Sequence, residues 1–236
     1  MHARRKKQAT SGTNAATAVF AERKRRARAI ARALKELLPN ARIALNYSNH
    51  WELAVAVVLS AQCTDKKVNE VTARLFKKYR TLEDYIRGDP REFEQDIRET
   101  GFFRAKAKNI LAAARILKER FGGMVPCSME ELLLLPGVAR KTANVILGNA
   151  CGIVVGVAVD THVKRFAQKF NLSDSRDPQR IERDLMELLP QCEWFTITYR
   201  LIDYGRHFCP ARKHECGEHP LTKLYPRAAG IWPRAR

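Results

Sequence analysis

Hydrophobic positions along this chain recur mostly at the three- and four-residue spacing of helices. In residues 21–38, Ile30, Leu34, Leu37 and Leu38 fall on one side and arginines fall on the other. This arrangement is typical of an amphipathic helix. Residues 51–62 (WELAVAVVLSAQ) are hydrophobic nearly all round, which predicts a central buried helix. Similar patterns predict further helices in residues 64–79, 82–88, 91–100, 104–123, 129–135, 161–170, 179–190 and 195–208.

Helix-start signals precede several of these segments. Asn49 and Ser128 each stand three residues before a glutamate, which is the pattern of a capping box. Asp89-Pro90 combines an N-cap with a proline suited to the first helical position. One apolar run, IVVGVAV (153–159), lacks helical spacing, but the glycine within it disfavours a β-strand that could form a sheet. We therefore predict an all-α fold with about ten helices.

The charge balance indicates a polyanionic partner. The chain of 236 residues has 43 Lys+Arg against 25 Asp+Glu, a formal net charge of +18. A positive excess of this size attracts polyanions, although an unspecific basic surface is the simpler alternative. Residues 1–20 join a basic cluster to a run of small and polar residues without a sustained period. We predict that they form a disordered basic tail.

Other compositional features bound the class of protein. No apolar run approaches the roughly 20 residues of a membrane span, and no apolar core of a secretion signal follows the N-terminus. We therefore expect a cytoplasmic protein that does not bind membranes. The six cysteines are too sparse for a disulfide scaffold, and in a reducing compartment most of them should be packed thiols.

Candidate chemistry is concentrated in residues 134–160, LLPGVARKTANVILGNACGIVVGVAVD. Pro136-Gly137 ends one short predicted helix just before another begins. Gly137 can take the positive φ of a tight hairpin and turn backbone N–H groups outward. Amides that converge at a helix start can bind a phosphate. An ordinary connection between two helices is the alternative interpretation of this turn.

Lys141 and Asp160 are the candidate reactive groups of this stretch. Lys141 lies in the first turn of an apolar helix and follows Arg140. The helix start, the neighbouring cation and partial burial would all favour a neutral, nucleophilic amine. Asp160 precedes a helix, and its carboxylate could assist the deprotonation of the lysine or stabilise a developing positive charge. The alternatives are a surface lysine and a simple helix N-cap.

The order and spacing of these residues resemble a known family. LPGVARKTANVIL followed by VAVDTHV is similar to the helix-hairpin-helix and catalytic segment of the endonuclease III family, which are DNA glycosylases with associated lyase activity. The similarity runs from about Ala44 to His219. It implies a two-domain fold with a six-helix barrel over 43–154, including the helix-hairpin-helix at about 129–148. It also implies a second helical domain that combines 21–42 with 155–236, with DNA bound in the cleft between the two domains.

The resemblance implies an enzyme of base excision repair. Lys141 is its nucleophile and Asp160 the carboxylate partner. The implied reaction removes oxidised pyrimidines from duplex DNA through a lysine Schiff base and then cuts 3′ to the abasic site by β-elimination. The alternatives are a related glycosylase with a different base specificity or mainly AP lyase activity, and a non-catalytic DNA-binding protein. A monomer acting on DNA with damaged bases or abasic sites is expected, nucleoid-associated if the source is bacterial.

Further residues are expected to contact DNA. By the resemblance, Gln62 fills the gap left by the flipped base, and Phe102 falls where the family carries an apolar wedge. Phe102 could instead be plain core. The phosphate-contacting set implied by the resemblance or by positive charge consists of Arg104, Gly137, Ala139, Arg140, His162, Arg212 and Lys213.

The chain departs from the family pattern in the hairpin. Ala139 replaces a glycine of the usual Gly-Val-Gly, and the added methyl should weaken the phosphate grip slightly if φ stays negative. Leu133 stands where close relatives carry a glutamate, and the loss of this acidic group could alter substrate preference.

The larger departure is in the C-terminal loop. Family members commonly hold a 4Fe–4S cluster through four cysteines, whereas only Cys209 and Cys216 match here. We therefore expect a degenerate iron–sulfur loop without a cluster, because four thiolates are required. A zinc site from Cys209, His214, Cys216 and His219 is compatible with the ligand types, but its spacing matches no known signature. We predict no metal.

Overall fold

The computed structural model describes residues 2–231, and their side chains from Thr17 onward. Helices and the turns between them make up this part of the chain, and no strand occurs in it. The predicted all-α fold class is therefore confirmed. The chain divides into two compact units, one formed by residues 1–42 and 156–236 and the other by residues 43–155. Each unit is described separately below.

The unit of residues 43–155 is built around a buried helix. Its α-helices are α2 (His50–Leu59), α3 (Asp65–Lys78), α4 (Leu82–Arg87), α5 (Pro90–Asp96), α6 (Phe103–Arg120), α7 (Met129–Leu132) and α8 (Arg140–Ile146). A 3₁₀ turn, η1 (Arg98–Thr100), precedes α6, and a π-helical turn, η2 (Leu147–Cys151), follows α8. Helix α2 packs against α3, α6 and α8, and its residues 53–59 are all buried. This confirms the prediction from its uninterrupted hydrophobic pattern.

Helix caps in this unit follow the sequence signals. The Asn49 side chain accepts a hydrogen bond from the Glu52 amide at 2.9 Å, and Ser128 accepts one from the Glu131 amide at 3.2 Å. Asp89 accepts from two amides of α5, and Pro90 is its first residue. Because these side chains satisfy amides that lack helical partners, short helices such as α5 and α7 have defined starts.

A disulfide joins Cys127 to Cys151 in this unit. Cys127 lies just before α7 and Cys151 ends η2, so the bond closes a loop that contains the hairpin between α7 and α8. We expected most cysteines to be packed thiols, and Cys63, Cys192, Cys209 and Cys216 are free. The pairing of the other two depends on their approach to 5.9 Å between Cα atoms, which no spacing rule predicts.

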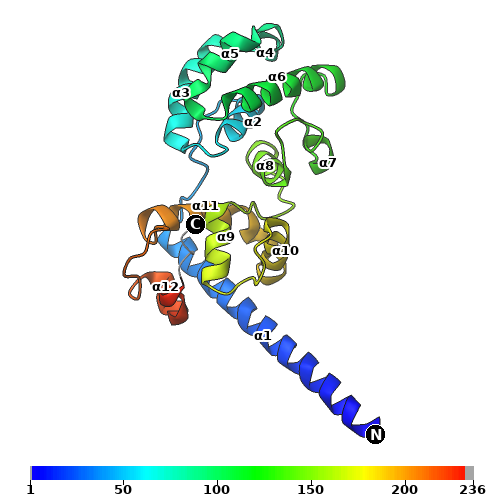
Figure 1. Ribbon diagram of the computed structural model, residues 1–236, viewed down its shortest axis with the longest axis vertical. Coiled ribbons are helices and arrows are strands. Elements are labelled where there is room, and N and C mark those ends of the chain that lie inside the picture. Colours follow the sequence, from blue (N-terminus) through cyan, green and yellow to red (C-terminus); the bar gives the residue numbers. More distant parts are fainter. Residues whose placement is uncertain (1, 232–236) are drawn as a thin grey trace. The chain divides into compact units, whose positions relative to one another are not determined.

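The other unit combines the N-terminal helix with the C-terminal helices. It contains α1 (His2–Leu37), α9 (Thr161–Lys169), α10 (Pro178–Leu188), α11 (Gln191–His207), α12 (Pro220–Leu224) and a final 3₁₀ turn, η3 (Pro226–Gly230). Helix α1 packs on α10, α11 and α12, and α9 packs on α10 and α11 (Figure 1). Its core includes Ile30, Leu34, Phe166, Phe170 and Tyr204, all essentially inaccessible to solvent.

The first helix differs from the sequence expectation. Apolar periodicity predicted a helix from Ala21 and a disordered tail over residues 1–20, whereas the structure continues α1 back to His2. This segment contains no proline and several alanines, so nothing in it prevents helix continuation. The side chains of residues 1–16 lie outside the described part, and the disorder of the tail stays a prediction. No helix in the described residues is long and apolar enough to cross a membrane.

Candidate active-site and nucleic-acid-binding residues

The hairpin between α7 and α8 is a tight turn with one left-handed glycine. Gly137 has φ +83°, and the Val138 amide donates to the Leu135 carbonyl at 3.1 Å. A Cβ at position 137 would come within 3.0 Å of the Asn109 Cβ on α6. The site therefore requires glycine for two reasons, its backbone angle and its close approach to α6.

Ala139 occupies the N-cap of α8 without strain. Its φ of −91° and ψ of 171° are extended, so a methyl group is tolerated at this position. No side-chain hydrogen bond caps α8. The first amides of a helix lack intrahelical partners, and here no N-cap side chain takes them up.

Lys141 is the second residue of α8. Residues 143–147 are buried in the core beneath it, while the Lys141 side chain is exposed. The predicted partial burial of this lysine is therefore wrong, because its side chain leaves the helix on the solvent side. Of the three features expected to favour a neutral Lys141 amine, the helix start and the neighbouring Arg140 are present, and burial is not.

Asp160 lies in the other unit and caps α9. Its Oδ1 accepts a hydrogen bond from the Val163 amide at 2.8 Å, so the N-cap interpretation of this residue describes its local role. The carboxylate is partly exposed. The segment before it is anchored, because residues 157–159 are buried and the Thr198 hydroxyl donates to the Ala158 carbonyl at 3.0 Å. Asp160 is thus held at a fixed position, and its side chain is partly accessible to solvent.

Gln62 and Phe102 share an unusual backbone. Both have left-handed dihedrals, φ 53° and φ 48°, and both are exposed. The Phe102 ring is 66% exposed, which excludes the alternative that it belongs to the core. Left-handed backbone at non-glycine residues costs of order 1 kcal/mol or more and is concentrated at functional positions.

Lys106 links the segments that carry these two residues, and no pattern in the sequence singles it out. Its Nζ donates to the Leu59 carbonyl at the end of α2 and to the Thr100 carbonyl in η1, each at 2.8 Å. Burial lowers the pKa of this lysine. In the sequence Lys106 looks like the other lysines of α6. Only the structure shows that it fixes the two turns relative to each other.

The predicted phosphate contacts lie on both units. Arg104 is exposed beside Phe103, and Arg140 is the first residue of α8. His162 follows Asp160 by two residues on α9 and packs against Gly205, where a Cβ would approach its Nδ1 to 2.4 Å. Arg212 and Lys213 are exposed in the loop after α11.

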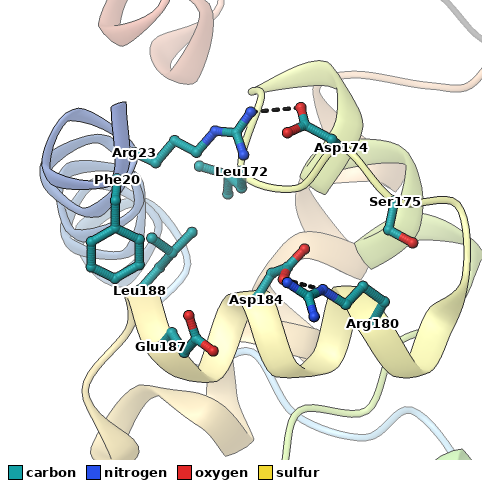
Figure 2. A pocket seen from close by; sticks show the side chains of 9 residues that line it. All are labelled: Phe20, Arg23, Leu172, Asp174, Ser175, Arg180, Asp184, Glu187 and Leu188. Carbon is teal, nitrogen blue, oxygen red and sulfur yellow. Dashed lines mark hydrogen bonds and ion pairs between the residues drawn. The ribbon is translucent and has the colours of Figure 1, made fainter. Parts of the chain in front are cut away.

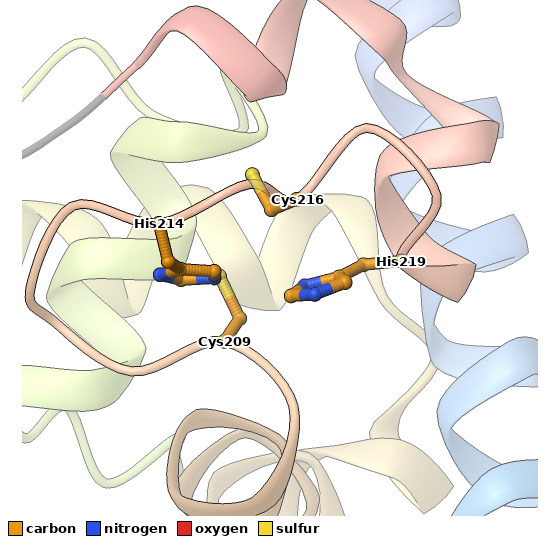
Figure 3. A group of neighbouring side chains, drawn as sticks. All are labelled: Cys209, His214, Cys216 and His219. Carbon is orange, nitrogen blue, oxygen red and sulfur yellow. The ribbon is translucent and has the colours of Figure 1, made fainter.

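Four potential metal ligands gather in that same loop. One donor atom each from Cys209, His214, Cys216 and His219 lies within 4.8 Å of the others (Figure 3). A 4Fe–4S cluster needs four thiolates, and this group supplies two thiols and two imidazoles. Tyr225, at the position of the fourth cysteine in the family pattern, instead places its ring 4.0 Å from the Arg26 guanidinium. The residues present do not fit the cluster.

A separate hollow lies between α1, α10 and the turn after α9. It has a volume of about 420 Å³ and is lined by the residues drawn in Figure 2, with ion pairs between Arg23 and Asp174 and between Arg180 and Asp184. None of the predicted site residues lines it.

Comparisons with known proteins decide the family. Residues 55–191 match the model of the HhH-GPD superfamily base excision DNA repair proteins. The chain is 52% identical over 209 residues to endonuclease III of Synechocystis sp., covering 89% of this chain and 95% of that protein. The chain belongs to the endonuclease III family. Endonuclease III of Bacillus subtilis is 44% identical over 190 residues, covering 80% of this chain and 86% of that protein.

Solved structures of the family share its fold. A non-covalent endonuclease III–DNA complex and a trapped endonuclease III–DNA covalent intermediate each superimpose with a TM-score of 0.82 at 42% identity. Each match covers 87% of this chain and 96% of the solved chain. The resemblance inferred from the sequence is confirmed. The region matched by the family model contains Lys141 and Asp160 but ends before the Cys/His loop.

Proposed function

We propose that this endonuclease III family protein is a base-excision DNA glycosylase with AP lyase activity. The observation that carries the proposal is the match to a trapped covalent intermediate of endonuclease III with DNA, at 42% identity over most of both chains. A covalent intermediate requires a nucleophile, and Lys141 is an exposed lysine at the helix start that follows the hairpin. Its substrates are oxidised pyrimidines in duplex DNA.

The proposed reaction begins with the damaged nucleotide turned out of the duplex. The Lys141 amine attacks C1′ of the sugar while the C1′–N bond to the base breaks, and the base leaves with the bonding electrons and a proton. The C1′–O4′ bond then breaks, the ring oxygen takes up the second proton of the amine, and the C1′=N double bond of a Schiff base forms. Abstraction of a C2′ proton then expels the 3′ phosphate by β-elimination.

Asp160 is the proposed acid–base and electrostatic partner of the lysine. Its carboxylate is fixed by the Val163 amide, so it can accept a proton or stabilise the oxocarbenium-like sugar without first reorganising. Gln62 and Phe102 are proposed to occupy the space vacated by the flipped nucleotide. Their exposed side chains and left-handed backbones are the structural support for this role.

Contacts to the DNA backbone are proposed for the hairpin and for cations on both units. Gly137, Ala139 and Arg140 form one contact, and Arg104 adds a second in the same unit. His162, Arg212 and Lys213 are the proposed contacts of the other unit. Such contacts position the protein without reading sequence.

We also propose that the enzyme acts as a monomer on cellular DNA, in the cytoplasm or nucleoid of a bacterial cell. It carries no 4Fe–4S cluster, because the cluster needs four thiolates and the loop supplies only two thiols. A brown purified protein containing about four irons per chain would contradict this part of the proposal.

Borohydride trapping on an abasic-site duplex tests the enzyme. Reduction of the Schiff base should give a covalent protein–DNA adduct with the wild type and none with Lys141→Ala. Lys66→Ala is a matched control, because Lys66 is also exposed and is also the second residue of its helix, α3. A wild-type protein that forms no adduct would instead be a non-catalytic DNA-binding protein.

One observation favours a second candidate with a different base specificity. Leu133 stands where relatives carry a glutamate, and its side chain is 45% exposed beside the hairpin. An apolar group there cannot hydrogen-bond a polar damaged base. A panel of duplexes, each with one lesion, distinguishes the two candidates, and Leu133→Glu should shift activity toward oxidised pyrimidines if the residue sets preference.

A further inference from the structure

The loop between α11 and α12 brings together a donor set suited to a single metal ion. Cys209 follows α11 by two residues, His214 and Cys216 lie within the loop, and His219 is the N-cap of α12. Their four donor atoms all lie within 4.8 Å of one another. Bond lengths of about 2.3 Å to sulfur and 2.0–2.1 Å to nitrogen place tetrahedral zinc ligands about 3.3–3.8 Å apart. The side chains need to draw in by about 1 Å, which rotamer adjustment can supply.

Burial distinguishes this group from a chance surface cluster. Cys209 is 0% exposed and Cys216 is 2% exposed, and neither forms a disulfide. The two imidazole rings are stacked with centroids 5.1 Å apart. The Nδ1 atom of His219 is buried and has no hydrogen-bond partner among the described residues. A buried polar atom left in this way is costly unless another group, such as a metal ion, occupies it.

A backbone contact prepares His214 to act as a ligand. Its Nδ1 lies 2.8 Å from the Arg212 carbonyl oxygen. A carbonyl can only accept, so Nδ1 carries the proton and Nε2 carries the lone pair. Histidine ligands of zinc typically donate their second ring nitrogen to a carbonyl or carboxylate in this manner, which fixes the tautomer and the ring orientation.

A cation lies beside one of the two thiols. The Arg165 Nη1 lies 4.0 Å from the Cys209 Sγ and also donates to the Cys209 carbonyl at 2.7 Å. Two thiolates and one divalent ion form a locally neutral group. Binding would release the two thiol protons to solvent.

We propose that Cys209, His214, Cys216 and His219 bind one structural Zn²⁺ ion in place of an iron–sulfur cluster. Four protein ligands leave no open coordination position, so the ion organises the loop and takes no part in catalysis. It joins the end of α11 to the start of α12 and fixes the backbone that presents Arg212 and Lys213. The sequence spacing C-x4-H-x-C-x2-H matches no familiar signature, and only the fold shows that the four residues meet.

Metal analysis of the purified full-length protein is the first test. Cells are grown with both zinc and iron supplied, and we expect about one zinc per chain with no stoichiometric iron or acid-labile sulfide. About four irons with sulfide would overturn the proposal, as would a metal-free protein. A Cys209–Cys216 disulfide in the purified protein, detected by thiol titration, would overturn it as well.

Cobalt substitution tests the ligand set. Co²⁺ in a tetrahedral site with two thiolates gives intense visible ligand-field bands and thiolate-to-metal charge transfer in the near ultraviolet. Cys216→Ser and His214→Ala should weaken metal binding by more than tenfold. His207→Ala is the control, because His207 is an exposed histidine at the end of α11 whose Nδ1 lies 2.9 Å from the Asp203 carbonyl oxygen, and it does not belong to the Cys/His group. Equal binding by the wild type and His214→Ala would exclude the proposed set.

A replacement that preserves ligation separates metal binding from misfolding. His219→Cys should still bind about one zinc ion, and its Co²⁺ form should show stronger charge-transfer absorption from a third thiolate. His219→Ala should lose most of its zinc, and its thermal midpoint should become insensitive to chelator. A His219→Cys protein that folds but binds no zinc contradicts the assignment. Borohydride trapping is measured separately, so failure of the proposed activity leaves this test unaffected.

Discussion

Two single residues, Gln62 and Phe102, have backbone conformations that their side chains do not favour. They lie at turns held together by Lys106, whose ammonium group donates to the Leu59 and Thr100 carbonyls. Neither side chain is buried, so packing does not compensate for the unfavourable dihedrals. We interpret the arrangement as a rigid support that presents an amide and an aromatic ring to DNA.

Phe102→Gly should change activity and stability in opposite directions. Glycine adopts φ 48° without penalty, so the free energy of unfolding should be unchanged or rise by up to about 1 kcal/mol. Removal of damaged bases should fall by at least tenfold, because the side chain proposed to replace the flipped nucleotide is gone. Urea unfolding and single-turnover glycosylase assays measure the two effects.

Phe102→Leu serves as the companion variant, because leucine keeps a large apolar side chain at this position. It should retain most of the activity. Full activity of Phe102→Gly would show that the ring is not a wedge.

Tyr79 gives the stability a pH dependence at alkaline pH. Burial, with a hydrogen bond from its hydroxyl to Asp96 at 3.0 Å, raises the pKa of Tyr79 to about 12. The unfolded chain therefore loses this proton near pH 10, before the folded protein does. The folded state binds more protons between about pH 10 and 12, so stability is fully present below pH 10 and falls across this interval.

The matching variant is Tyr79→Phe. It should be less stable than the wild type by about 1–3 kcal/mol at pH 8, because it lacks the hydrogen bond to a carboxylate. The difference should shrink as the pH rises above 10. Urea midpoints at several pH values give the comparison, and a difference that stays constant up to pH 12 would contradict the role of this hydroxyl.

At the scale of elements, the hairpin is defined by what surrounds it. Asn109 on α6 packs closely against Gly137, and the disulfide joins the segment before α7 to the end of η2. Seven-residue α8 is short for an isolated helix, and its stability comes from packing on α2 and α7. A DNA contact made by backbone amides depends on this support, since no side chain caps α8.

The disulfide should contribute measurably to the stability of its unit. The cysteines are separated by 24 residues, and closing a loop of this size in the unfolded chain corresponds to about 3–4 kcal/mol. The double variant Cys127→Ser, Cys151→Ser should lose roughly this amount in urea unfolding under oxidising conditions. Under reducing conditions the free energy of unfolding of the wild type should fall toward that of the double variant.

Cys192→Ser is the control for this experiment, because Cys192 is an exposed free thiol. It should unfold like the wild type under both conditions. If the wild type is equally stable with and without a reductant, then the bond does not form in solution.

At the scale of the whole molecule, the formal charge of +18 dominates the expected interaction with DNA. Exposed cations occur on both units, including Arg104 and Arg212. Each phosphate contact releases condensed counterions, so affinity for duplex DNA should fall steeply with salt. Six contacts would give a decrease of about 10³-fold between 50 and 200 mM salt.

Arg140→Gln should reduce the slope of log K against log salt by about 1, because it removes one of the phosphate contacts proposed at the hairpin. Binding should weaken similarly on every sequence. Arg87→Gln is the matched control, since Arg87 lies on α4, is 79% exposed and pairs with Glu83. Fluorescence anisotropy over a salt series measures both slopes, and equal slopes for the two variants would remove Arg140 from the phosphate-binding set.

Much of this protein follows from local sequence. Apolar periodicity identified the helices, the all-apolar pattern of residues 51–62 identified the buried α2, and side chains such as Asn49 and Ser128 marked helix starts. These signals succeed because they act between neighbours within one or two turns. The family resemblance rested on the hairpin segment together with motifs matched in order from about Ala44 to His219, since short-range spacing within each motif can be recognised without the fold.

Tertiary structure decided the properties that depend on distant residues. Lys141 is exposed, Phe102 projects from a strained turn, and Lys106 links two turns separated by some 40 residues. The Cys127–Cys151 bond and the approach of His214 to His219 likewise depend on how separate segments pack. From the sequence we expected no metal in the C-terminal loop, because only two of the four cysteines are present and the Cys/His spacing matches no known zinc signature. Only the folded loop brings two thiols and two imidazoles within reach of one ion, because ligand geometry is set by three-dimensional distance.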